Sequence, residues 1–139
     1  MRTKFYWTQR FPARKTVVIE HSYQPISGNY NSASYFAEPG PGAEFCVDWK
    51  TRLAIEAMGV RDDLTGRRSS ANDTDYILKT AKTWNGPIGR FHLMLDKMKP
   101  ENLLSLCWPG DLKKAGPTTF EYTAEQFTPN RDIHLLVLE

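Results

Sequence analysis

Long apolar runs, a large charge of one sign and a cleavable leader are all missing from this sequence. No stretch approaches the roughly 18 apolar residues that a membrane-spanning helix needs. The 139 residues carry a formal net charge of +2, too small to indicate a nucleic-acid surface, and basic pairs such as Arg67-Arg68 are isolated. No apolar segment follows the charged N-terminal residues, as it would in a signal peptide. We therefore predict no membrane span and no nucleic-acid partner.

Residues that could carry chemistry are also few. The three histidines, His21, His92 and His134, lack the His-x-His or His-x-x-x-His spacing of a zinc site. The acidic residues between positions 62 and 75 lack the spacing of a calcium loop and alternate with arginines. No nucleophile stands beside a base at a recognisable spacing, and no glycine-rich phosphate loop is present. The sequence predicts a protein that is not an enzyme, with no metal site and no cofactor.

What is present favours strands. Aromatic residues make up 12% of the chain and hydrophobic residues 40%, in a length that suits one domain over residues 1–139. The clearest signal lies at residues 83–96, where Trp84 and the turn sequence Asn85-Gly86-Pro87 precede a segment that alternates apolar and polar residues. That pattern predicts a tight turn that leads into a strand.

Shorter segments with strand character recur along the chain. We expect an antiparallel hairpin from Phe5 to Tyr23, with its turn at residues 11–15. The remaining expected strands are residues 76–83, 103–108, 118–123 and 133–138, with a short helical turn or loop at residues 125–129. About seven short strands with regular turn signals predict a mainly β fold, an antiparallel β-sandwich with one short α-helix.

The one expected helix spans residues 48–58. Asp48 suits the N-cap, and Gly59 stands where a C-terminal glycine is common. Trp49, Leu53 and Ala57 form one apolar stripe, which we expect to pack against a sheet. The flanking segments read as irregular: residues 24–44 as a long loop held by aromatic residues, and residues 60–75 as an exposed excursion.

Several motifs together resemble a known family over nearly the whole chain. They are Phe11-Pro12-Ala13, His21-Ser22-Tyr23-Gln24-Pro25, Phe45-Cys46-Val47-Asp48, Trp84-Asn85-Gly86-Pro87-Ile88-Gly89-Arg90-Phe91, Leu104-Ser105-Leu106-Cys107, Gly116-Pro117-Thr118-Thr119-Phe120-Glu121 and Phe127-Thr128-Pro129-Asn130-Arg131-Asp132. Together they resemble the C-terminal half of a bacterial domain-of-unknown-function family, the one numbered 4424. The resemblance implies an exported protein, periplasmic or extracellular, of which this chain is a fragment. It implies no activity.

Cys46 and Cys107 take their meaning from that implied compartment. Two cysteines in an exported chain usually form one disulfide, and this pair would close a loop of about 60 residues. The alternatives are two buried free thiols or a redox pair, and the absence of a Cys-x-x-Cys motif disfavours the redox pair. We expect a structural disulfide.

Two functions stay open at this point. The favoured one is a non-catalytic exported module that works through protein–protein or inter-domain contacts. Its partner would be the N-terminal half of its own chain or another protein, with a homodimer through a sheet edge as a further form. The alternative is a carbohydrate-binding module that uses Trp84, Tyr30 and Tyr35 as surface contacts.

Overall fold

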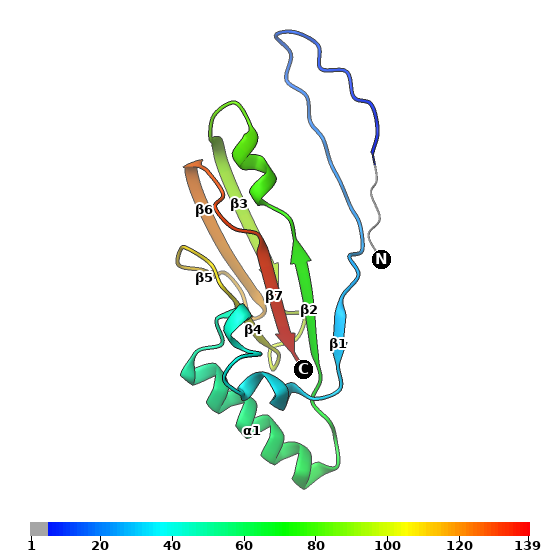
Figure 1. The fold of residues 1–139 in the computed structure, drawn as a ribbon, viewed down its shortest axis with the longest axis vertical. Coiled ribbons are helices and arrows are strands. Elements are labelled where there is room, and N and C mark those ends of the chain that lie inside the picture. Colours follow the sequence, from blue (N-terminus) through cyan, green and yellow to red (C-terminus); the bar gives the residue numbers. More distant parts are fainter. Residues whose placement is uncertain (1–5) are drawn as a thin grey trace.

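The computed structural model describes residues 6–139 and shows two antiparallel sheets with one α-helix (Figure 1). The first sheet has the order β1-β2-β7-β4 and the second β3-β6-β5. The strands are β1 (Gly28–Tyr30), β2 (Ala71–Tyr76), β3 (Ile88–Asp96), β4 (Leu103–Leu106), β5 (Lys113–Lys114), β6 (Thr119–Phe127) and β7 (Ile133–Leu138). The helical elements are α1 (Trp49–Thr65) and the 3-10 turns η1 (Ala33–Ala37), η2 (Ala43–Phe45) and η3 (Lys79–Thr83). The predicted mainly β sandwich with one helix is confirmed.

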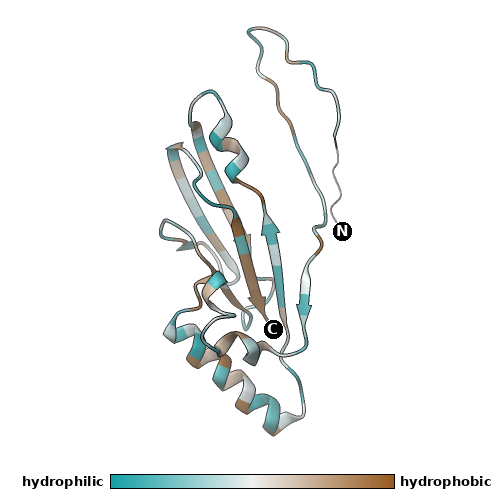
Figure 2. Cartoon of the chain, viewed as in Figure 1, coloured by the Kyte–Doolittle hydropathy of each residue, from teal (hydrophilic) through white to brown (hydrophobic). Residues whose placement is uncertain are grey.

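The four-stranded sheet is covered on both of its faces, and its strand β7 carries apolar side chains on each face. Leu136 and Leu138 are fully buried in a core that α1, η1 and η2 share with the sheet. Ile133 and Leu135 point to the opposite face and line a cleft against β3. Figure 2 shows β7 as a strongly hydrophobic strand. The molecule therefore has three layers, with the helical layer at one end of the first sheet.

Helix α1 starts as predicted and ends later than predicted. The Asp48 carboxylate accepts a hydrogen bond from the Thr51 N–H at 2.7 Å, which caps the helix and lowers the pKa of Asp48. Gly59 does not end the helix, since its φ is not positive and its Cα lies against Ser34 of η1. The chain leaves the helix at Gly66, whose φ is 69° and whose N–H donates to the Asp62 carbonyl.

The apolar stripe predicted on this helix faces solvent and does not pack on the sheet. Trp49 and Leu53 are 66% and 55% exposed, and Ala57 is exposed as well. Ile55 and Met58, on the opposite side of the helix, are the residues that enter the core. The prediction was wrong because the helix is apolar on two sides, and the sequence alone does not say which side meets the sheet.

The predicted N-terminal hairpin is also wrong in the part that the structure describes. Residues 6–27 form neither strand nor helix, and Phe5 lies outside the described residues. Figure 1 shows this segment, which we call the arm, running past the ends of both sheets and turning back. An isolated two-stranded hairpin is marginal in water, and this one has no layer beneath it, so its strand propensity is not realised.

Three further predictions need correction. Residues 60–75 are not an exposed excursion, because they complete α1 and then form β2, which pairs with both β1 and β7. The segment 76–83 is not a strand of its own, because Tyr76 ends β2 and residues 79–83 form η3, and residues 125–127 continue β6. The strand prediction for residues 133–138 is confirmed, and those for residues 88–96, 103–106 and 119–123 hold with small shifts of boundary.

Asp132 fixes the start of η3. Its Oδ1 accepts hydrogen bonds from the N–H groups of Lys79, at 2.8 Å, and Leu78, at 2.9 Å. The Lys79 ammonium lies 3.6 Å from its other oxygen. The backbone bond from Lys79 is the largest of the effects that lower the pKa of Asp132. This carboxylate ties the end of β2 to the turn that precedes β7.

Candidate functional site

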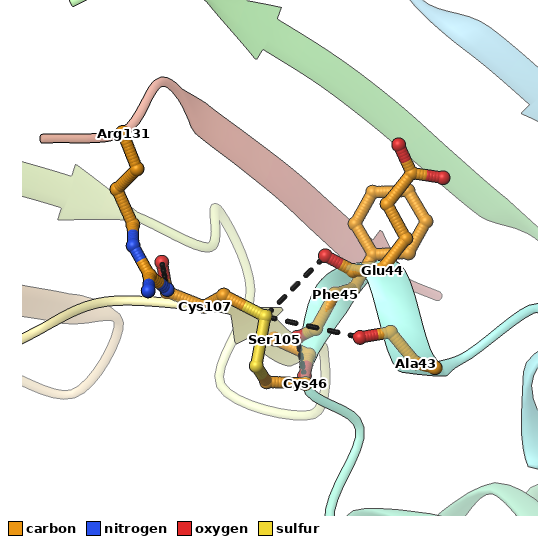
Figure 3. Close-up of a disulfide and its surroundings, with 7 residues drawn as sticks. All are labelled: Ala43, Glu44, Phe45, Cys46, Ser105, Cys107 and Arg131. Atoms are coloured by element: carbon orange, nitrogen blue, oxygen red, sulfur yellow. Dashed lines mark hydrogen bonds between the residues drawn. A yellow bond between two sulfur atoms is a disulfide. The ribbon is translucent and has the colours of Figure 1, made fainter. Parts of the chain in front are cut away.

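A disulfide joins Cys46 to Cys107 (Figure 3), the pairing that was predicted from the sequence. Cys46 follows η2 with a left-handed φ of 52°, and Cys107 directly follows β4. The Cys107 sulfur lies 3.4 Å from the Glu44 carbonyl oxygen. Because a bonded sulfur carries no hydrogen, this approach is a contact in which nothing is donated.

Two hydrogen bonds reinforce this junction. The buried Ser105 hydroxyl donates to the Phe45 carbonyl at 2.9 Å, and the Arg131 guanidinium donates to the Cys107 carbonyl at 3.4 Å. The disulfide closes a loop between positions 61 residues apart, and that loop contains α1, β2, β3 and β4. The junction therefore holds the helical layer on the first sheet and leaves no reactive thiol in the chain.

On the face of the first sheet away from the helical layer, the two sheets do not close completely on each other. A cleft of about 300 Å³ separates β2 and β7 from β3, and its walls are mostly apolar. Its lining residues are Thr74, Tyr76, Leu78, Phe91, His92, Leu93, Leu95, Ile133 and Leu135. The aromatic cluster of Phe91, Trp108, Tyr122 and Phe127 packs beside it.

Two strand edges border this cleft without a partner strand among residues 6–139. β3 is the outermost strand of its sheet. β1 pairs with β2 only opposite residues 71–73, and beyond them the hydroxyls of Ser27 and Thr74 are hydrogen-bonded at 3.0 Å. The end of β2 at Asp75 and Tyr76 is therefore not extended by a strand on that side.

The arm touches this open region at a few points. The Tyr23 ring stacks near the Tyr76 ring of β2 with ring centres 6.4 Å apart, and within the arm itself the Trp7 and His21 ring centres lie 4.7 Å apart. Most of its other large apolar side chains are exposed, among them Val18 at 79% and Ile26 at 86%. We call the arm, the cleft and these two unpaired edges the open side.

The aromatic residues predicted as surface contacts are not assembled into one site. Tyr30 and Tyr35 stack with ring centres 5.9 Å apart, and the Asp73 carboxylate raises the pKa of Tyr30. Trp84 is exposed, but it follows η3, whereas Tyr30 and Tyr35 belong to β1 and η1 at the other end of the sheets (Figure 1). No row of exposed rings joins the two places.

The histidines and carboxylates form separate pairs and do not gather into one site. His134 Nδ1 is 2.8 Å from Asp75 Oδ1 and 3.8 Å from a Glu44 oxygen, whereas His92 pairs across strands with Glu121 at 3.7 Å. Within residues 6–139 no group of three or more such side chains could hold a metal ion. No helix in this part of the chain is both long and apolar enough to cross a membrane.

Sequence reasoning missed most of the open side. Residues 71–76 are Ala-Asn-Asp-Thr-Asp-Tyr, which has too few apolar residues to signal a strand. Only its placement between β1 and β7 makes it one. The only sequence signal for the open side was the strand-like alternation of the arm. We interpret the arm as a segment that forms a strand only when it packs against another layer.

The fold and the junction define the class: a small disulfide-bonded β-sandwich domain with one helix. A family model described as a domain of unknown function matches residues 1–136, so the chain belongs to the family DUF4424. No curated protein and no solved structure matches the chain.

Proposed function

We propose that this protein is a non-catalytic exported module that works through protein–protein contacts made by its open side. The observation that carries this proposal is the position of the arm. It holds exposed apolar residues beside two unpaired strand edges and an apolar cleft. Apolar side chains exposed together beside a groove are a common mark of an interaction site.

The chemistry of the open side suits a partner that brings a strand. Unpaired N–H and C=O groups at a sheet edge accept an added strand, and pockets for alternate side chains give such pairing its specificity. The apolar cleft between β2 and β3 offers room for such side chains. The arm, rich in β-branched and aromatic residues, would gain from the same contact the layer it lacks.

The disulfide supports export. Such bonds persist in oxidising compartments and are rare in the cytosol of most cells. The bacterial periplasm or the extracellular space is therefore the proposed location. The partner is either a further part of the same polypeptide, as the family resemblance implies, or a separate protein.

Site-specific photo-crosslinking in the producing cell tests the proposal. A photoreactive residue at Val18 or Ile26 of the arm should yield a discrete protein adduct that mass spectrometry identifies. The matched control is Lys113, which is exposed on β5 at the far edge of the same sheet as β3 and should yield none.

Other results would overturn the proposal. One is the absence of an adduct from both arm positions while the protein is folded and exported. Another is turnover of esters, phosphates or glycosides by the purified protein. Glycan binding that Trp84→Ala abolishes would favour the carbohydrate-binding alternative.

A further inference from the structure

Helix α1 carries a second apolar face that the fold does not use. Its residues follow one another at steps of three or four, so they form one row along the helix. The row consists of Trp49, Leu53, Ala57, Val60 and Leu64. The four large members are 55 to 82% exposed, and apolar bands recur along α1 in Figure 2. We call this row the outer stripe.

The core does not account for the outer stripe. Ile55 and Met58, which anchor α1, lie on the opposite side of the helix, and Ile55 is fully buried. Five apolar positions in one row over 17 residues amount to a helix-packing surface, with the spacing that a second helix would cover.

The charges beside the stripe indicate which partner fits. Lys50 and Arg61, eleven residues apart, lie on one flank, and Glu56 and Asp63, seven apart, lie on the other, where the half-buried Arg52 follows them on the side toward the core. If two copies of α1 pack in parallel about a two-fold axis along the helices, the basic flank of each meets the acidic flank of the other. An antiparallel pair would place like charges together.

The same charges argue against other occupants. Residues 49–65 hold three basic side chains (Lys50, Arg52, Arg61) and three acidic ones (Glu56, Asp62, Asp63), so the helix has no net charge. An anionic membrane surface or a nucleic acid would gain little electrostatic attraction from it.

We infer that the outer stripe is a homodimer seam, in which two copies of α1 pack in parallel through Trp49, Leu53, Ala57, Val60 and Leu64. The seam lies on α1 and shares no residue with the open side. Dimerisation therefore leaves the open side of each copy accessible and presents two such sides in one particle. A helix of this length spans about 25 Å, so the interface between the two copies is small. The dimer should therefore dissociate at low protein concentration.

Sedimentation of the purified protein over a range of concentrations measures the dimer. Leu53→Asp and Leu64→Asp should each raise the dissociation constant at least about tenfold, because each places a charge within an apolar seam. Trp84→Asp, exposed directly after η3 at the end of the sheets away from α1 (Figure 1), is the matched control and should leave the constant unchanged.

Charge exchange tests the flanks. Glu56→Lys with Asp63→Lys makes both flanks basic, and Lys50→Glu with Arg61→Glu makes both acidic, so each double variant alone should be monomeric. Mixing the two should restore a dimer that contains one copy of each. Circular dichroism confirms that both variants are folded before they are mixed.

Orientation is tested by oxidation of variants that add one cysteine to the native disulfide pair. In a parallel dimer, the cysteine of Leu64→Cys should form a disulfide with the same position of the second copy. Crosslinking at Ala57→Cys but not at Leu64→Cys would show an antiparallel pair and overturn the proposed geometry. A protein that stays monomeric at every concentration, or binds vesicles through Leu53, would overturn the seam itself. Neither result bears on the arm crosslinks that test the proposed function.

Discussion

Removing the disulfide tests how firmly the helical layer is held on the first sheet. In the double variant Cys46→Ala and Cys107→Ala, the folded structure keeps the buried Ser105 hydroxyl bonded to the Phe45 carbonyl. Alanine at position 46 bears much the same left-handed backbone cost as cysteine, whose φ is 52°. The main effect should therefore fall on the unfolded chain, which is released from a closed loop.

The magnitude follows from the length of that loop. For positions 61 residues apart, the chain-entropy relation gives a loss of about 14 cal/mol/K, or about 4 kcal/mol at 25 °C. Domains of this kind are stable by about 5–15 kcal/mol, so the variant should fold but be far less stable.

Urea unfolding followed by circular dichroism measures this difference, with the oxidised protein as reference. The spectrum before unfolding should match that of the parent protein. Ser105→Ala, which removes only the hydrogen bond, should cost about 1 kcal/mol and serves as the comparison. A loss below about 1 kcal/mol in the cysteine variant would refute the reasoning, because the loop would then be constrained by other means.

Three further changes have defined outcomes. Ile55→Ala should lower the free energy of unfolding by about 2–5 kcal/mol, whereas Leu53→Ala, at a protein concentration too low for dimers, should cost less than about 1 kcal/mol; equal losses in urea unfolding would contradict the assigned core. Asp132 has a folded pKa below its unfolded value of 3.8, so its contribution is present above pH 3.8 and lost as pH falls through the folded pKa. Asp132→Asn keeps an acceptor and should flatten that part of an acid-unfolding profile; an unchanged profile would assign the loss to other carboxylates. Gly28→Ala would place a Cβ against the Asp73 carboxylate, so thermal unfolding should shift to lower temperature, and an unchanged midpoint would mean that the Asp73 side chain turns aside at no cost.

The strands that could be predicted from sequence are those whose own residues alternate between apolar and polar or form a continuous apolar run. Residues 88–96 place Phe91, Leu93 and Leu95 on one face and exposed residues on the other, and this local pattern is the one the fold uses. Residues 133–138 are apolar except for His134, which suits a strand that the structure covers on both faces.

The failures have tertiary causes. Gly59 looks like a helix terminator in isolation, but its φ is not positive and the helix continues through it to Thr65. The arm has the sequence of a hairpin and lacks the layer that would hold it as one. The first part of the outer stripe, Trp49, Leu53 and Ala57, was visible in the sequence, and only the position of Ile55 and Met58 in the core shows that it faces outward.

One part of the candidate site could be predicted from the sequence and the other part could not. The Cys46–Cys107 pair could be predicted from the compartment that the family resemblance implies. The open side could not, because it depends on which edges remain unpaired after two sheets have formed. Strand order is a long-range property that no local pattern of residues 71–76 or 88–96 contains.

The claim that the arm is a binding element is tested most directly by amide hydrogen exchange. It is measured on the monomeric protein alone and again with the partner that crosslinking identifies. We predict that residues 6–27 exchange rapidly in the free protein while β2 and β7 are protected, and that the arm and β3 gain protection together in the complex. Protection of the arm in the free protein, or a complex that protects neither the arm nor β3, would contradict the account.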